Sequence, residues 1–123
     1  MSLAEYFENT EGTGVLATCD SQGNVDIAIY ARPYVIDKNT IAFSMAERLS
    51  YQNIQSNSKA AYLFIEKGQG YKGKRLYLMK VGEESNSQRI KEIKAKRSSS
   101  HKTTTVEKHL VYFTVDETRP LVG

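Results

Sequence analysis

The chain has 123 residues, of which 25% are charged, and its formal net charge is +3. This length predicts a single domain over residues 1–123 with one hydrophobic core. The charge is too small to indicate nucleic acid as the main partner. Because Cys19 is the only cysteine, an internal disulfide and a cysteine metal cluster are excluded, and a cytoplasmic location is expected. No apolar run approaches the ~20 residues of a membrane span, so no membrane association is expected.

The first part of the chain predicts a short helix and two strands. Ser2 is a suitable N-cap for a helix whose apolar face carries Leu3, Tyr6 and Phe7, and a glycine at position 12 or 14 would end it. Strands are expected over residues 15–20 and 25–36, with a turn at residues 21–24 between them. Proline cannot donate to a strand ladder, so Pro33 predicts an edge, a bulge or a bend in the second strand.

Residues 40–66 read as a strand, a polar elbow, a short helix and another strand. Larger apolar residues alternate with small ones from Ile41 to Ala46, which is the period of a half-buried strand. The elbow (residues 44–51) then brings a guanidinium and hydroxyl groups together, with Ser50 as the expected N-cap. Free N–H groups and the helix dipole attract anions, and a guanidinium can bind two phosphate oxygens. The elbow is therefore a candidate anion site, and an ordinary surface turn is the alternative.

The rest of the chain predicts two more strands and a basic helix. The glycine-rich link after Glu66 reads as a hairpin loop, because it lacks the spacing of a phosphate-binding loop. Strands are expected over residues 75–82 and 106–116, and a helix over residues 88–97. The Ser/Thr-rich tract at residues 98–105 is low in complexity. About six strands with short connections predict a mainly β fold, an antiparallel barrel with short α-helices.

No constellation of side chains indicates catalysis or metal binding by the protein alone. His101 and His109 have no partner at metal-ligand spacing, and we expect both to be solvated. Glu83 and Glu84 are explained by turn solvation rather than by paired-carboxylate catalysis. A bound cofactor would then carry the chemistry. The basic segment 89–102 has no interleaved aromatic residue to stack bases, so a solvated helix face is preferred to a nucleic-acid site.

The order of these parts resembles the pyridoxamine 5'-phosphate oxidase-like family of FMN-binding split barrels, in its small single-domain form. The resemblance is carried by residues 31–64, A-R-P-Y-V-I-D-K-N-T-I-A-F-S-M-A-E-R-L-S-Y-Q-N-I-Q-S-N-S-K-A-A-Y-L-F. The closing H-L-V-Y-F-T-V-D-E-T-R-P-L-V-G is similar to the family's last strand and tail. The resemblance implies a six-stranded antiparallel split barrel of Greek-key type, and a homodimer that binds FMN between its subunits.

The resemblance also implies which residues bind the cofactor. The residues that would bind the phosphate lie at the strand end and in the elbow: Ser44, Met45, Arg48, Leu49, Ser50 and Tyr51. A second set of residues, here called the ring group, would flank the isoalloxazine from a strand with free backbone groups at a bulge: Tyr30, Ala31, Arg32 and Pro33.

The elbow departs from the family pattern. Leu49 and Ser50 stand where arginine and lysine are usual, which leaves Arg48 as the elbow cation. Substitutes could come from elsewhere in the chain: Arg32, Lys72, Lys74 or Arg75. The C-terminal arginine and histidine pattern of pyridoxamine phosphate oxidases is not evident, so vitamin B6 oxidation is not expected. The expected function is an FMN-dependent oxidoreductase acting on a small substrate or redox partner. The alternatives are a non-enzymatic binding module that uses segment 89–102, and a split barrel that binds deazaflavin or haem.

Overall fold

The computed structural model describes residues 2–85, 92 and 108–123. These residues contain the helices α1 and α2 and seven strands, in this order: α1 (Leu3–Asn9), β1 (Gly12–Cys19), β2 (Val25–Ile29), β3 (Tyr34–Val35), β4 (Thr40–Ala46), α2 (Leu49–Ser56), β5 (Lys59–Glu66), β6 (Gly73–Glu84) and β7 (Lys108–Pro120). The predicted helix at 88–97 apart from residue 92, the tract at 98–105 and residues 106 and 107 of the last predicted strand lie outside the described residues. Neither α1 nor α2 is long and apolar enough to cross a membrane.

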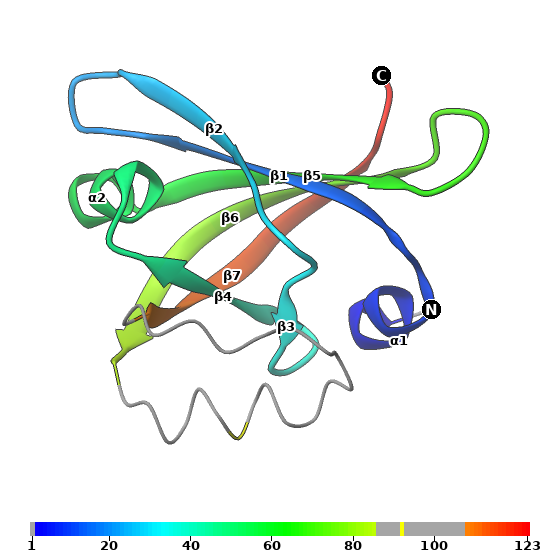
Figure 1. The fold of residues 1–123 in the computed structure, drawn as a ribbon, viewed down its shortest axis with the longest axis horizontal. Coiled ribbons are helices and arrows are strands. Elements are labelled where there is room, and N and C mark those ends of the chain that lie inside the picture. Colours follow the sequence, from blue (N-terminus) through cyan, green and yellow to red (C-terminus); the bar gives the residue numbers. More distant parts are fainter. Residues whose placement is uncertain (1, 86–91, 93–107) are drawn as a thin grey trace.

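The seven strands form one antiparallel sheet in the order β2-β1-β5-β6-β7-β4-β3 (Figure 1). The sheet curls, but its edge strands β2 and β3 are not paired within the described part of the chain, so the barrel is not closed. The sequence predicted six strands. The seventh arises because residues 25–36 break into β2 and β3, with the interruption that Pro33 predicted between them. The Greek-key type stays a prediction.

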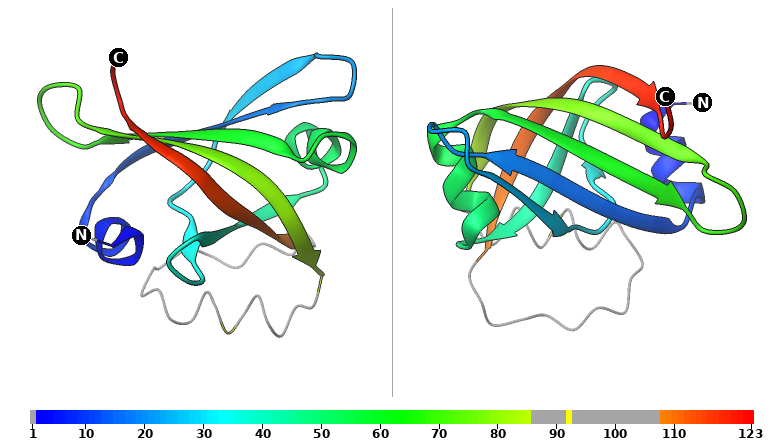
Figure 2. Two further views of the ribbon diagram at one scale, coloured as in Figure 1. Left: turned by 180° about the vertical axis from the view of Figure 1, so that it is seen from behind. Right: turned by 90° about the horizontal axis from the view of Figure 1, so that it is seen from above.

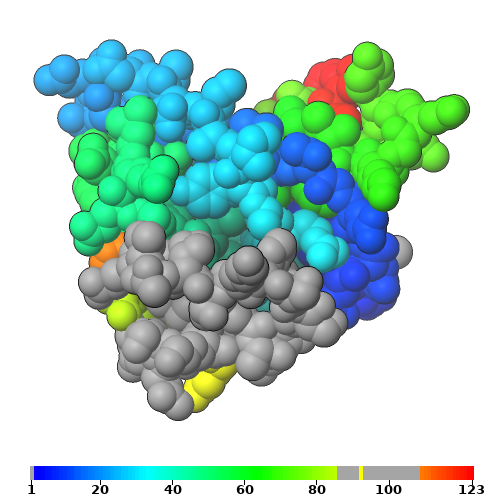
Figure 3. Space-filling view, in the orientation of Figure 1, coloured from blue at the N-terminus to red at the C-terminus, as the bar shows by residue number. Residues whose placement is uncertain are grey.

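The hydrophobic core lies on the inner face of the curled sheet. Its largest members are aromatic rings whose centroids lie 4.9–6.4 Å from their neighbours, most of them edge to face: Tyr6, Phe7, Tyr30, Phe43, Tyr62, Phe64 and Phe113. Each such pair adds about 0.5–1.5 kcal/mol beyond the area that it buries. Two hairpin tips, β1–β2 and β5–β6, project beyond this core with a hollow between them (Figure 3).

Helix α1 covers one end of the barrel (Figure 1). Ser2 caps it as predicted, because its Oγ accepts a hydrogen bond from the Glu5 amide at 3.2 Å. Phe7 is 1% exposed and packs among the core rings. At the other end of the helix, the Arg32 guanidinium donates to the carbonyls of Phe7 and Thr10 at 2.6 and 3.1 Å. Both ends of α1 therefore have side-chain hydrogen-bond partners.

Gly12 and Gly14 do not end α1 but lie inside β1. A Cβ added to Gly14 would lie 1.8 Å from the hydroxyl oxygen of Tyr62. That hydroxyl donates to the carbonyls of Tyr30 and Ala31 at 3.0 and 3.2 Å. The glycine thus leaves room for the Tyr62 side chain, which bonds the segment after β2 to the core.

Helix α2 covers the opposite end of the barrel (Figure 2). Ile54 joins the core and is 1% exposed. On the side of β1, the buried Asn53 amide donates to Thr18 Oγ1 at 3.1 Å. On the side of β6, Tyr51 and Gln55 both bond to Glu83. The helix is therefore attached to two separate parts of the sheet, which fixes the direction of its first turn.

Candidate functional site

The start of α2 is an uncapped helix terminus. The N-cap residue is Arg48, with φ −125° and ψ −167°, and its side chain makes no capping hydrogen bond. Ser50, the predicted N-cap, lies in the first turn instead, because the helix begins at Leu49. Within the described residues, the amides of residues 49–51 have no acceptor, whereas the Gln52 amide donates to Arg48 O at 3.0 Å. Free amides at the positive end of a helix form a place for an anion.

Two predicted cofactor-binding residues extend from this helix start into solvent. Arg48 is exposed, and no other described residue forms a hydrogen bond or ion pair with its guanidinium. The Leu49 side chain next to it is 53% exposed. A free guanidinium beside free amides offers charge-assisted donors to an oxyanion, and the leucine adds apolar surface for a flat ring.

Ser50 turns inward and contacts β2. It is 4% exposed, and its Oγ donates to Asp26 Oδ2 at 3.3 Å. Burial raises the pKa of Tyr30, which a hydrogen bond with Ser50 and the charge of Arg48 partly oppose. The structure therefore places Tyr30, Arg48 and Ser50 near one another, and it adds the negative charge of Asp26 to them.

Ser44 and Met45 do not reach this place. Met45 points into the core and is fully buried. Ser44 lies on the other face of β4, and its Oγ is a buried atom without a hydrogen-bond partner in the described part of the chain. Strand alternation, which places neighbours on opposite faces, explains why the two residues cannot serve one ligand together.

Three of the four suggested substitute cations are engaged elsewhere, and the fourth, Lys72, is exposed in the β5–β6 hairpin. Arg32 bonds to the carbonyls at the end of α1. The Lys74 ammonium lies 4.7 Å from the centroid of the Tyr6 ring. The Arg75 guanidinium donates to the carbonyl of Pro120 at 2.7 Å. These contacts leave Arg48 as the cation that the described residues place at the elbow without a partner.

The backbone of the ring group is less free than the sequence suggested. The Tyr30 amide donates to Gly14 O at 3.0 Å, and the carbonyls of Tyr30 and Ala31 already accept hydrogen bonds from Tyr62. Pro33 is buried, whereas Ala31 is exposed. A flat ligand beside this segment would therefore meet the exposed Ala31 and the side chain of Tyr30 rather than a row of free backbone groups.

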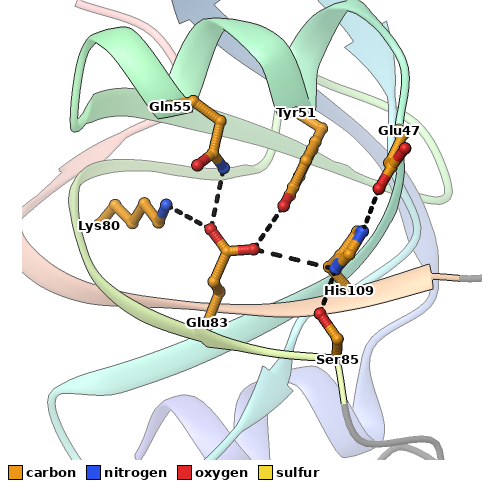
Figure 4. A network of polar contacts seen from close by, with 7 residues as sticks. All are labelled: Glu47, Tyr51, Gln55, Lys80, Glu83, Ser85 and His109. Atoms are coloured by element: carbon orange, nitrogen blue, oxygen red, sulfur yellow. Dashed lines mark hydrogen bonds and ion pairs between the residues drawn. The ribbon is translucent and has the colours of Figure 1, made fainter.

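Tyr51 turns away from the helix start toward a polar network (Figure 4). Its hydroxyl donates to Glu83 Oε2 at 2.5 Å, and its ring stacks on the His109 imidazole with centroids 4.5 Å apart. His109 Nε2 lies 2.8 Å from Glu47 Oε1, and Nδ1 lies 2.5 Å from Ser85 Oγ. The network joins the elbow, α2, β6 and β7 at one end of the barrel.

Glu83 is the anionic centre of this network. Burial raises the pKa of Glu83, but hydrogen bonds from Lys80, Tyr51 and Gln55 outweigh burial and lower the pKa to about 2. The hydrogen bond to Glu83, together with burial, raises the pKa of Tyr51 to about 12. At neutral pH Glu83 is therefore ionised, and Tyr51 is a neutral donor to it.

The sequence prediction for His109 and Glu83 was wrong. His109 was expected to be solvated, but it is 8% exposed, and Glu83 lies on β6 rather than in a solvated turn. One signal could have placed the histidine, because Val111 and Phe113 lie on the inner face and His109 precedes them with the same period of two. No group of three or more His, Cys, Asp or Glu side chains among residues 2–85, 92 and 108–123 is arranged to hold a metal ion.

The donors at the start of α2 fit an anionic head group such as a cofactor phosphate. They are backbone N–H groups and one guanidinium, which suit phosphate oxygens. The hydroxyls of Ser50 and Tyr51 add no donor, because each is bonded to a carboxylate. The fold and this helix start together define an open antiparallel split barrel with a place for an anion at one end.

Known structures share this fold. No protein-family model matches the sequence, and no curated protein matches it. An FMN-binding protein from Syntrophomonas wolfei superposes with a TM-score of 0.79 at 17% identity, over 99% of this chain and 85% of that one. An F420 reductase gives 0.75 at 13% identity, over 94% of both chains. A candidate pyridoxamine 5'-phosphate oxidase from Lactobacillus delbrueckii gives 0.70 at 19% identity, over 95% of this chain and 89% of that one.

These likenesses show that the chain has the fold of the pyridoxamine 5'-phosphate oxidase-like split barrels. They confirm the mainly β, antiparallel split-barrel fold that the sequence resemblance implied, but neither its six strands nor its Greek-key type.

Proposed function

We propose that the protein is a flavin-dependent oxidoreductase that binds FMN, with the phosphate at the start of α2. The observation that carries this proposal is the uncapped helix start beside the free guanidinium of Arg48. The fold supports it, because a protein described as FMN-binding shares that fold. An F420 reductase shares it as well, so a deazaflavin is the alternative cofactor for the same place.

The bound cofactor would supply the electron or hydride transfer. The chain's own part is to bind and orient it. The amides of residues 49–51 and the Arg48 guanidinium would hold the phosphate, and Leu49 and Ala31 would offer exposed apolar surface to the ring. A small molecule or a redox protein would exchange electrons with the cofactor.

Four neighbouring strands carry an apolar outer face that no described element covers. Seen from above, β2, β1, β5 and β6 lie side by side with nothing in front of them (Figure 2). On β2 the three apolar residues of this face are 71–80% exposed. The strand registers align them with apolar neighbours across the sheet: Val25, Ile27 and Ile29 with Val15, Ala17, Cys19, Ala61, Leu63 and Tyr77.

This outer face supports a homodimer with the cofactor in the groove between subunits. Contiguous exposed apolar patches mark interaction surfaces, and a two-fold interface brings the same patch of both subunits together. Charged residues flank the apolar ones, with Lys59 at one end of the β5–β6 pairing and Arg75 opposite Leu63 toward the other end, as expected for the rim of an interface. The dimer would act in the cytoplasm, where the thiol of Cys19 stays reduced.

Spectroscopy and titration test the cofactor assignment. The purified protein should show flavin absorbance, or the apo-protein should quench the fluorescence of added FMN in a saturable, equimolar titration. A matched titration with a deazaflavin decides between the two cofactors. A colourless protein that takes up neither compound contradicts the proposal, and a haem spectrum would replace it.

The substitution Ile27→Lys tests the dimer. Ile27 is 71% exposed at the middle of β2, on the outer face, and the substitution would bury an unpaired charge in the proposed interface, at a cost on the order of several kcal/mol. We expect a dimer-to-monomer shift in light scattering. The control is Tyr71→Lys in the β5–β6 hairpin, where the side chain is 83% exposed and lies off the face, and where no shift is expected. A monomeric wild-type protein would contradict the homodimer.

A further inference from the structure

His109 and Glu47 form a contact beside the proposed anion site that cofactor binding does not itself require. Glu47 directly precedes the N-cap residue Arg48, and its side chain is 69% exposed. Its carboxylate nevertheless lies 2.8 Å from His109 Nε2 and is directed at the imidazole rather than at the helix (Figure 4). A carboxylate at this position could instead bind the start of the helix, because the positive end of a helix and a free guanidinium both attract it.

Contacts at both ring nitrogens and a stacked ring hold the imidazole in place. His109 lies opposite Met45 in the β4–β7 pairing, so its side chain points inward beneath α2. The Tyr51 ring stacks on it at an interplanar angle of 12°, Ser85 Oγ meets Nδ1, and Glu83 Oε2 lies 3.9 Å from Nδ1. An ionised carboxylate can only accept, so the proton shared with Glu47 belongs to Nε2.

We propose that His109 is a positioning residue of the anion site: it holds the Glu47 carboxylate away from the free amides of α2 and from Arg48. With Glu47 held by the imidazole, the helix start and the guanidinium stay available to a ligand phosphate. Without the imidazole, the carboxylate would turn to the helix start and compete with the ligand. This inference rests on the proposed function, since the ligand in question is the phosphate of FMN.

A double-mutant cycle tests the inference by FMN affinity. His109→Phe keeps a ring for Tyr51 to stack on but cannot bond to Glu47, and we expect it to weaken FMN binding roughly threefold to tenfold, as for a charge at a helix start. Glu47→Gln alone should bind FMN at least as tightly as the wild type. The double variant should match Glu47→Gln, because no carboxylate is left to compete. Ser85→Ala is the matched control, since it removes the other imidazole contact and should change the affinity less than twofold.

The outcomes separate a positioning role from a structural one. If His109→Phe binds FMN like the wild type, the inference is wrong. If the double variant stays as weak as His109→Phe while circular dichroism shows an intact fold, the histidine acts on the structure alone and the inference is also wrong.

Failure of the proposed function would look different. If the wild type binds neither FMN nor a deazaflavin, inorganic phosphate replaces them as the probe in an amide NMR titration. Shifts at residues 49–51 that are lost in His109→Phe and regained in the double variant would support the inference without the flavin. Absence of any such shift in the wild type would overturn both.

Discussion

The two helices close opposite ends of the barrel, and their termini are treated differently. The first turn of α1 is capped by Ser2, and its last carbonyls accept hydrogen bonds from Arg32. The first turn of α2 has no capping side chain, and Arg48 stands beside it without a partner among the described residues. Helix α1 inserts Phe7 among core rings, whereas α2 places Ile54 in the core and adds polar contacts to β1 and β6. Because α1 shows that side chains of this chain can cap and bond the ends of a helix, the open start of α2 is consistent with the proposed phosphate site.

The strongest test of this difference between the helices replaces one arginine at each, Arg48 at α2 and Arg32 at α1. Arg48→Ala should weaken FMN binding by about 1.5–3 kcal/mol, as for loss of a hydrogen bond to a charged group, and leave the free energy of unfolding nearly unchanged. Arg32→Ala should do the reverse and lower the free energy of unfolding by about 1–3 kcal/mol, because two carbonyls of α1 lose their donor. Flavin titration and urea denaturation measure the two quantities.

The arginine pair also decides between two views of Arg32. The family resemblance placed Arg32 with the residues that flank the ring, whereas its observed contacts are with α1. Equal losses of FMN affinity in both variants would contradict the division between a structural and a ligand-binding end.

The same division explains what the sequence could predict. The cap at Ser2 and the apolar face of α1 were predicted because they depend on residues three or four positions apart. The partners of Arg32 lie 22 and 25 positions away, so no local pattern pairs them. At the other end, the elbow was identified as an anion site from its residue types. Its N-cap was misplaced, because the start of α2 depends on where β4 ends, and several polar residues there are equally suited to cap it.

The contacts of His109 also could not be predicted from local sequence patterns. Its partners Glu47 and Ser85 lie 62 and 24 positions away, and β7 meets them only after the sheet has curled. Period-two alternation could place the imidazole on the inner face, but it could not identify the carboxylate that it would meet. The fold class was thus predictable from alternation and hairpin spacing, whereas the pairing of charges at the α2 end was not.

Acid titration sharpens the comparison with a smaller effect. The pKa of Glu83 lies at about 2 in the folded state against 4.5 for an ordinary glutamate, so its contacts add stability above pH 4.5 that is lost as the pH falls toward 2. We expect Glu83→Gln to reduce this acid-induced loss by about 1–2 kcal/mol, since a neutral amide has no charge to lose. The measurement is the free energy of unfolding between these pH values.

The control for Glu83 comes from the other end of the molecule. Glu8→Gln removes an exposed carboxylate of α1 that has no hydrogen-bond partner among the described residues. If both variants reduce the loss of unfolding free energy at low pH equally, that loss reflects net charge rather than the network beneath α2.

The smallest expected effect concerns the caps themselves. Ser2→Ala should lower the free energy of unfolding by about 1 kcal/mol, because the Glu5 amide loses its acceptor. At α2 the matched change is Arg48→Ser, compared with Arg48→Ala so that loss of the guanidinium is common to both. The serine should be more stable than the alanine by about 0.5–1 kcal/mol, since its hydroxyl can accept from a free amide of the first turn. For the same reason it should bind FMN more weakly than the alanine, because that amide is no longer available to the phosphate. A serine that stabilises α2 without reducing affinity would mean that the ligand does not use these amides, and that the helix start is open for another reason.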